Sequence, residues 1–196
     1  MILYLIRHGK TEANLKHLYC GSTDLPLSDV GSAELLERKS VYESKDFSGF
    51  RFISSGMKRC NETLKILFGD VDFEMNEAFR EIDFGIFEMH SYDELKDDSA
   101  YQEWISGDNQ ANCPPGGESG NQMNERVMNA FKGLMKSKEI DNFVLVSHGG
   151  VIAAIMGEVF AKEEKNMYQW QPKPGEGYRL IFDNGNWKYE PIYGRL

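Results

Sequence analysis

Two histidines in this sequence each lie one residue after an apolar run and directly before a glycine. His8 follows the run ILYLI and Arg7, and His148 follows VLVS. Arg59 stands in a third segment that opens with an apolar run, RFISSGMKRC. Guanidinium groups bind phosphate oxygens bidentately and repel divalent cations, so this set predicts an anion site, most simply for a phosphoryl group. A neutral imidazole there is a competent nucleophile near neutral pH, provided that its other nitrogen donates to a fixed acceptor.

The apolar runs before these residues are typical of central strands in a sheet that helices cover on both faces. In such α/β folds, ligands lie at the carboxyl ends of the strands. Three pairs occupy predicted strand ends: Arg7-His8, Ser54-Ser55 and Ser147-His148. We therefore expect these pairs to share one edge of the sheet.

Helical periodicity and turn residues complete the predicted fold. Helices are expected from Met57 to Leu67, over 119–135 behind an S-x-x-Q capping box, and in GGVIAAIMGEVF after His148. Asn184-Gly185 lies between two extended runs and predicts a type I′ hairpin. The prediction is an α/β protein, a three-layer α/β/α sandwich with a mostly parallel central sheet and a C-terminal β-hairpin.

Composition indicates one domain and excludes several classes of partner. The 196 residues are 41% hydrophobic, which is enough for one core without disulfides or metal, so 1–196 is interpreted as a single domain. From 77 to 115 the chain is predicted to be irregular, and 77–118 is interpreted as an insertion that covers the active site. A net charge of −9 argues against nucleic-acid or membrane-surface binding. The three widely spaced cysteines and the lack of a long apolar stretch favour a cytoplasmic protein.

Six ordered motifs give the sequence a resemblance to a known family. The segment LIRHGKTEAN is similar to the signature of the histidine phosphatase superfamily, the phosphoglycerate mutase-like proteins. Companion motifs follow in the family's order: GSTDLPLSDVG (21–31), SSGMKRCNET (54–63), REIDFGIFE (80–88), PPGGES (114–119) and VLVSHGGVI (144–152). A lone R-H-G would be weak evidence, whereas this ordered set is specific.

The resemblance implies a role for each residue of the predicted anion site. His8 would attack phosphorus and carry the phosphoryl group, while Arg7, Arg59 and His148 would hold its oxygens and offset the charge of the transition state. Asn14 would add a neutral donor. No metal and no cofactor are implied.

The resemblance also implies a proton donor and several substrate-binding residues. Glu81 matches the family's acid, which protonates the departing alkoxide and then takes a proton from water. Its rival is Glu88, and the sequence does not separate the two. Gly21, Ser22 and Gly149 are expected to contact substrate. If Glu81 is the acid, kcat/KM should fall on the alkaline side as it ionises.

The function implied is a metal-independent phosphomonoesterase, a phosphoric monoester hydrolase that acts on a small phosphorylated metabolite through a phosphohistidine. Short family members resemble α-ribazole phosphatases, so α-ribazole 5′-phosphate is a first candidate substrate, beside sugar phosphates and phosphoglycerates. The chain length favours hydrolysis over phosphoglycerate mutase chemistry, which must exclude water. A non-catalytic phosphate-binding protein is the alternative from another class. A homodimer is the default assembly.

The chain departs from the family pattern at two places and leaves the substrate open. The family usually has Pro-Leu in place of Gly56-Met57, and Glu-Gly in place of Glu88-Met89. The pocket wall is expected from 17–25 and 84–119. Five aromatic residues in these segments could stack on a ring of the substrate or could equally belong to the core: Tyr19, Phe84, Phe87, Tyr92 and Trp104.

Overall fold

A six-stranded mixed sheet forms the centre of this computed structural model, which describes residues 1–108, 110–136 and 142–193. The strands lie in the order β3-β2-β4-β1-β5-β6. Their bounds are β1 Ile2–Arg7, β2 Arg51–Ser54, β3 Glu74–Met75, β4 Phe143–Ser147, β5 Gly177–Asp183 and β6 Asn186–Ile192. Strands β1 to β4 pair in parallel, and β5 and β6 add antiparallel. Asn184 and Gly185 have φ of 48° and 79°, as a type I′ turn requires, so the predicted hairpin is confirmed.

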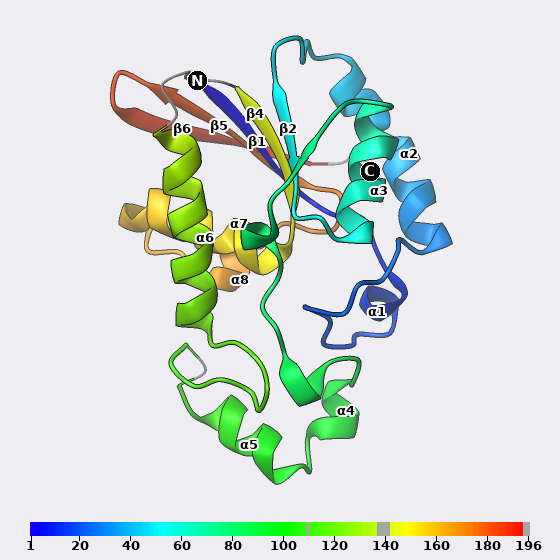
Figure 1. Cartoon of the computed structure of the whole chain (residues 1–196), viewed down its shortest axis with the longest axis vertical. Helices are drawn as coiled ribbons and strands as arrows, with labels where there is room; N and C mark the ends of the chain where they lie inside the picture. The colour runs from blue at the N-terminus through cyan, green and yellow to red at the C-terminus, as the bar shows by residue number, and fades with distance from the viewer. Residues whose placement is uncertain (109, 137–141, 194–196) are drawn as a thin grey trace.

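Helices cover both faces of the sheet (Figure 1). Helices α2 (Asp29–Glu43) and α3 (Lys58–Phe68) lie on one face, and α6 (Gly120–Met135), α7 (Gly149–Val159) and α8 (Met167–Trp170) lie on the other. Because successive side chains of a strand point to opposite faces, Leu3 and Leu5 join the core under α6 and α7, whereas Tyr4 and Ile6 join the core under α2 and α3. The predicted three-layer sandwich is confirmed.

The segment that follows β3 carries more helix than the sequence predicted. It contains the 3₁₀ helices η1 (Glu77–Phe79) and η2 (Gly85–Phe87) and the α-helices α4 (Tyr92–Leu95) and α5 (Ser99–Ser106). The expectation of an irregular chain from 77 to 115 is wrong for these stretches, because Ser91 and Asp98 cap α4 and α5. Both helices lie at the lower end of the view in Figure 1, around a separate small core.

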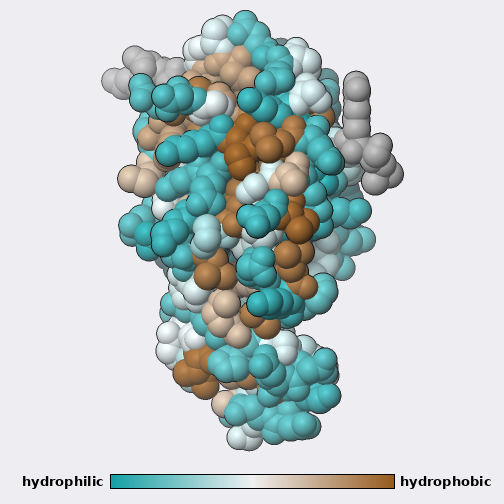
Figure 2. All heavy atoms as spheres, turned by 90° about the vertical axis from the view of Figure 1, so that its right-hand side faces the viewer, coloured by the Kyte–Doolittle hydropathy of each residue, from teal (hydrophilic) through white to brown (hydrophobic). Residues whose placement is uncertain are grey.

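Helix α1 (Glu12–Leu15) and the 3₁₀ helix η3 (Ala161–Glu163) complete the described elements. The face that carries α2 and α3 is hydrophilic over most of its area, with hydrophobic patches between (Figure 2). In the described part of the chain, every helix is too short or too polar to cross a bilayer.

Candidate active site

The parallel strands bring the three predicted strand ends together. Arg7 at the end of β1 pairs with Ser147 at the end of β4, and Ser54 at the end of β2 pairs with Val146. The backbone N–H of His8 donates to Ser147 O over 3.0 Å, which continues the ladder past the strand. Because β4 lies between β1 and β2, residues from both halves of the chain meet at one edge.

His8 is buried and has a defined tautomer. Its ring centroid lies 5.1 Å from that of His148, with the planes 64° apart. Its Nδ1 lies 2.7 Å from Gly9 O, and since a carbonyl only accepts, this nitrogen carries the hydrogen and the lone pair is on Nε2. Burial, with smaller effects from Arg59 and Arg7, holds the pKa of His8 well below its ordinary value of 6.5. The imidazole is therefore neutral near pH 7, with a free nucleophilic nitrogen.

His148 is fully buried and presents one unpartnered nitrogen. Its Nε2 lies 2.9 Å from Ser55 Oγ and 3.6 Å from Cys60 Sγ. Its Nδ1 has no hydrogen-bond partner among the described residues. Burial, aided by Arg59, lowers the pKa of His148 well below 6.5. When the Ser55 hydroxyl donates to Nε2, the ring hydrogen lies on Nδ1 and is available to an anion.

Two guanidinium groups flank the imidazoles, and both donate to backbone carbonyls. Arg59, in the first turn of α3, is 1% exposed and donates to Thr23 O and Gly21 O, each over 2.8 Å. Arg7 donates to Pro172 O over 2.8 Å, and its buried Nε has no partner in the described part of the structure. Carbonyls are neutral, so these contacts orient the cations and leave their charge uncompensated. We call Arg7, His8, Arg59 and His148 the cradle.

Glu81 faces the N-terminal end of α7. Its Oε2 accepts from the N–H of Gly150 over 3.0 Å, and a Cβ at Gly150 would collide with Oε1. A Cβ at the neighbouring Gly149 would collide with Gln171. Glu81 is close enough to Arg7 to oppose the effect of burial on the pKa of that guanidinium. Gly150 thus lets the acid approach the start of α7 closely, and Gly149 makes room for Gln171.

Glu88, the rival for the acid role, is fully engaged as an anchor. Its two oxygens accept from the N–H groups of Gly21, Ser22, Thr23 and Phe84 and from the Thr23 hydroxyl, over 2.7–3.2 Å. This carboxylate fixes the loop that accepts from Arg59. The geometry favours Glu88 as a structural residue and leaves Glu81 as the group that faces the open site.

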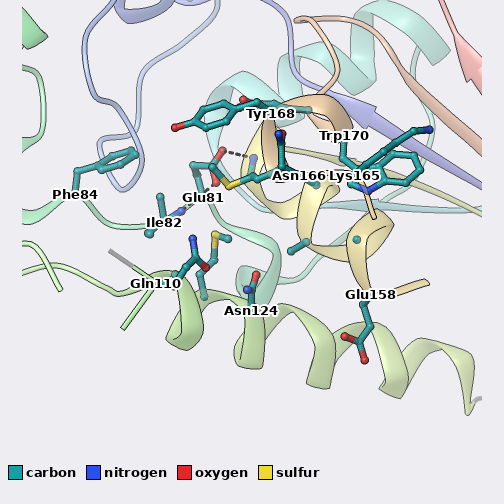
Figure 3. A pocket seen from close by; sticks show the side chains of 18 of the residues that line it. Glu81, Ile82, Phe84, Gln110, Asn124, Glu158, Lys165, Asn166, Tyr168 and Trp170 are labelled. Carbon is teal, nitrogen blue, oxygen red and sulfur yellow. Dashed lines mark hydrogen bonds between the residues drawn. The ribbon is translucent and has the colours of Figure 1, made fainter. Parts of the chain in front are cut away.

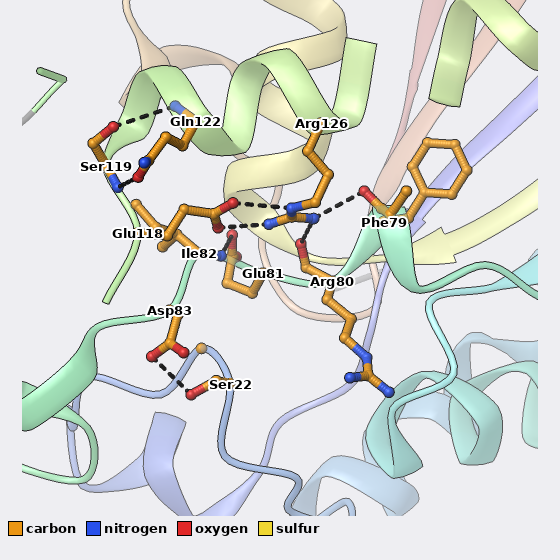
Figure 4. Close-up of polar contacts among 12 residues, drawn as sticks. Ser22, Phe79, Arg80, Glu81, Ile82, Asp83, Glu118, Ser119, Gln122 and Arg126 are labelled. Atoms are coloured by element: carbon orange, nitrogen blue, oxygen red, sulfur yellow. Dashed lines mark hydrogen bonds and ion pairs between the residues drawn. The ribbon is translucent and has the colours of Figure 1, made fainter. Parts of the chain in front are cut away.

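Asn14 and Ser22 make local contacts that the sequence did not predict. Asn14 Oδ1 accepts from the N–H and the hydroxyl of Thr11 in the capping box of α1. The hydroxyl of Ser22 donates to Asp83 over 2.9 Å (Figure 4). Their expected contacts with substrate stay predictions.

Arg126 is a further residue at the site, and the sequence analysis did not identify it. Its guanidinium donates to Ala78 O and Arg80 O and pairs with both oxygens of Glu118 (Figure 4). It thereby holds the backbone immediately before Glu81. The sequence carried only a weak signal for this role of Arg126, because no sequence pattern marks a helix arginine whose partners are backbone carbonyls.

A cavity of about 740 Å³ has Glu81 in its wall (Figure 3). Glu81 and Gly150 line it, whereas the four cradle side chains do not. Its walls come from α6, α7, the segment from Lys165 to Gln171, and residues around Ile82 and Trp104. The cavity therefore meets the cradle on the side of the acid.

The predicted pocket aromatics divide between this cavity and the core. Tyr19, Phe84 and Trp104 line the cavity. Phe87 is 1% exposed in the small core, and Tyr92 is 55% exposed on the surface. The walls from α6, α7 and 165–171 were not predicted, although four small residues of α7 at helical spacing gave a signal: Gly150, Ala153, Ala154 and Gly157.

Cys60, next to Arg59 in the sequence, is a packed thiol. It is fully buried against His148 and the Ser147 carbonyl, and burial raises its pKa to about 12. None of the three cysteines, all of them described, forms a disulfide. No group of three or more His, Cys, Asp or Glu side chains in the described ranges is arranged to hold a metal ion.

Comparisons with known proteins agree with the fold and the family resemblance. The sequence profile of the histidine phosphatase superfamily (branch 1) matches residues 3–193. An adenosylcobalamin/alpha-ribazole phosphatase of Salmonella typhimurium is 26% identical over 179 residues, which cover 89% of this chain and 87% of the relative. The alpha-ribazole phosphatase structure from Shigella flexneri superposes with a TM-score of 0.87 at 23% identity, covering 98% of this chain and 96% of that one. The phosphoserine phosphatase of Entamoeba histolytica, in complex with 3-phosphoglyceric acid, has a TM-score of 0.81 at 26% identity, covering 99% and 98%.

Proposed function

The chain belongs to the histidine phosphatase superfamily, and we propose that it hydrolyses small phosphomonoesters through a phosphohistidine on His8, without a metal. The observation that carries the proposal is the cradle. It combines a neutral imidazole whose Nε2 lone pair is free, a second imidazole 5.1 Å away, and two buried guanidinium groups without a carboxylate partner among the described residues. A phosphoryl dianion supplies the charge that this arrangement lacks.

In the first step, His8 Nε2 attacks phosphorus and the bond from phosphorus to the ester oxygen breaks. Arg7, Arg59 and the His148 Nδ1–H hold the three phosphoryl oxygens. Protonated Glu81 gives its proton to the departing alkoxide, which leaves as an alcohol. The proton stays on His8 Nδ1, which donates to Gly9 O throughout.

In the second step, water hydrolyses the phosphohistidine. The Glu81 carboxylate takes a proton from water, whose oxygen attacks phosphorus, and the bond from phosphorus to Nε2 breaks. Inorganic phosphate leaves, the lone pair returns to His8, and Glu81 is again protonated. Each turnover therefore consumes one water and no cofactor.

The relatives and the insertion add two finer proposals. Since a 26% identical relative is named an adenosylcobalamin/alpha-ribazole phosphatase, α-ribazole 5′-phosphate is the first substrate to test. We also propose that 77–118 covers the site, because it contributes Glu81, Phe84 and Trp104 to the cavity wall. A homodimer and a cytoplasmic location stay predictions, and sedimentation and cell fractionation would test them.

The test is p-nitrophenyl phosphate hydrolysis in EDTA by the native protein and by His8→Ala. We expect turnover by the native protein, no turnover by the variant, and an acid-labile, base-stable phosphorylated intermediate on His8 after rapid denaturation. No turnover on any phosphoester would support a phosphate-binding role instead. Isomerisation of 3-phosphoglycerate that outpaces phosphate release would identify a mutase.

A further inference from the structure

The cavity beside Glu81 accepts the alcohol part of the substrate. We infer that this alcohol is bulky, ring-bearing and uncharged, so that the enzyme selects such phosphomonoesters against those with a carboxylate. The inference rests on the proposed function, because Glu81 must protonate the ester oxygen. The phosphoryl group lies in the cradle, so the rest of the substrate must extend past Glu81, and that is where the cavity begins.

The size of the cavity exceeds what a three-carbon substrate needs. Its volume of about 740 Å³ lies in the range of pockets that enclose drug-sized ligands. The room comes from α7, which presents Gly150, Ala153, Ala154 and Gly157 to it on one helical face. A phosphoglycerate body would leave most of this space unfilled.

The walls of the cavity are suited to an apolar ring. Ile82, Phe84, Met123, Met128 and Trp104 line it. At its rim, three further large apolar side chains are unusually exposed: Ile105 (40%), Met167 (40%) and Tyr168 (78%). A ring in the cavity would remove this apolar surface from water, which favours binding.

The charges around the cavity disfavour a carboxylate on the substrate. Lys165 is the one cation among the described lining residues, and its ammonium lies 2.6 Å from a Glu163 oxygen and 4.2 Å from the Trp170 ring centroid. Its charge is already compensated. Glu81 and Glu158 line the cavity as well and would repel a second anion. A substrate with an added carboxylate would find no free cation there.

Neutral polar groups remain to hold an uncharged ligand. The Asn124 amide projects from α6 toward the cavity, and Gln110 lies beside it (Figure 3). Amides can both donate to and accept from hydroxyl groups or ring nitrogens. A polyhydroxylated or heterocyclic ring therefore fits the cavity better than a purely hydrocarbon one.

Three phosphomonoesters that expel primary alcohols test the inference on the native protein: ethyl phosphate, 2-phenylethyl phosphate and 3-phosphoglycerate. We expect kcat/KM for 2-phenylethyl phosphate to exceed that for ethyl phosphate by about tenfold or more, from ring burial. We expect 3-phosphoglycerate to be no better than ethyl phosphate. Equal values for the first two, or a preference for 3-phosphoglycerate, would overturn the inference while leaving the phosphatase activity intact.

Ala154→Phe fills the cavity and is the matched variant. It should lower kcat/KM for 2-phenylethyl phosphate about tenfold and change that for ethyl phosphate little. Ala161→Phe is the control, since Ala161 is exposed and does not line the cavity. A parallel loss on both substrates in a folded Ala154→Phe protein would contradict the inference.

A binding measurement separates the inference from the proposed function. Titration calorimetry with 2-phenylethylphosphonate and ethylphosphonate, which are not hydrolysed, should give at least tenfold tighter binding of the first to the native protein. Tighter binding without turnover of any phosphoester would defeat the phosphatase proposal and support the cavity. Equal binding with turnover would defeat the cavity alone.

Discussion

The two carboxylates Glu81 and Glu88 should separate in one pair of experiments. Glu81 accepts two inter-residue hydrogen bonds, one on each oxygen: from Gly150 N–H over 3.0 Å and from Ile82 N–H over 3.2 Å. The amide oxygen in Glu81→Gln can still accept from Gly150, so the variant keeps that contact, loses the longer one with Ile82 and removes the transferable proton. General acid catalysis contributes about 10²- to 10⁴-fold, so kcat/KM for an alkyl phosphate, which reports the steps up to departure of the alcohol, should fall by that factor. The kcat/KM for p-nitrophenyl phosphate should fall less than about tenfold, because nitrophenolate leaves without a proton.

Glu88→Gln should behave in the opposite way. Every group around the Glu88 carboxylate is an N–H or O–H donor. In Glu88→Gln the side-chain NH₂ must therefore face at least one backbone N–H in either orientation of the amide. In one orientation this is the N–H of Thr23, and in the other it is that of Ser22. An unsatisfied donor and the loss of charge-assisted bonds should cost about 2 kcal/mol. For a chain of this length, that lowers Tm by about 4–8 °C. Because the loosened loop also accepts from Arg59, kcat/KM should fall alike for both substrates.

The assay is steady-state kinetics on ethyl phosphate and p-nitrophenyl phosphate, with thermal melting of each variant. The diagnostic quantity is the ratio of the two kcat/KM values, which changes for Glu81→Gln and is constant for Glu88→Gln. The reverse pattern would refute the assignment of the acid to Glu81. Equal losses on both substrates for Glu81→Gln, with unchanged melting, would refute proton donation by Glu81.

Three further outcomes follow from the geometry. The pKa values of His8 and His148 lie below 6.5 in the fold, so the unfolded chain binds more protons in acid. The free energy of unfolding should therefore fall by about 1.4 kcal/mol per histidine for each pH unit below 6.5. Melting curves from pH 7.5 to 5.5 should show this pH dependence for the native protein and a weaker one for His8→Gln. Inorganic phosphate at about 100 times its Kd should stabilise the native protein against unfolding by about 2.7 kcal/mol, as measured by thermal unfolding in a calorimeter. Arg59→Leu should abolish this stabilisation. An unchanged Tm of the native protein would contradict the anion cradle. Because Arg126 positions Glu81, Arg126→Ala should slow alkyl phosphate hydrolysis at least tenfold more than p-nitrophenyl phosphate hydrolysis. Arg126→Lys should restore part of the lost activity. Equal losses on both substrates would indicate a purely structural role.

Local signals predicted the fold well, because they act within a few residues. The capping box at Ser119 starts α6, and Asn184-Gly185 makes the hairpin turn. The strand ends also located both cradle histidines, since parallel strands bring their carboxyl ends to one edge. The missed helix α4 carries an S-x-x-E pattern at Ser91 of the same kind, which shows that the signal was present.

Contacts between distant residues could not be predicted in the same way. Glu88 anchors Gly21 across 67 positions, and its partners are backbone N–H groups that every residue possesses. The family resemblance named Glu88 only as a rival acid. The departure at Met89 shows the same limit: its φ of 63° explains why glycine suits this position, yet only the backbone reveals it.

The proposed binding of a dianion to a chain with a net charge of −9 depends on the local charge of the cradle. Ion pairs elsewhere in the described structure neutralise other cations, among them Arg38 with Glu176 and Arg179 with Glu190. Arg7 and Arg59 instead donate to carbonyls, which orient a guanidinium without cancelling its charge. Burying two guanidinium groups that form no ion pair among the described residues costs stability. Burial of the imidazoles, with smaller effects from these cations, lowers the pKa of both histidines and keeps His8 nucleophilic. A bound phosphoryl group would offset the cost of burying the two guanidinium groups. The same buried charges that lower the stability of the fold should therefore bind the transition state.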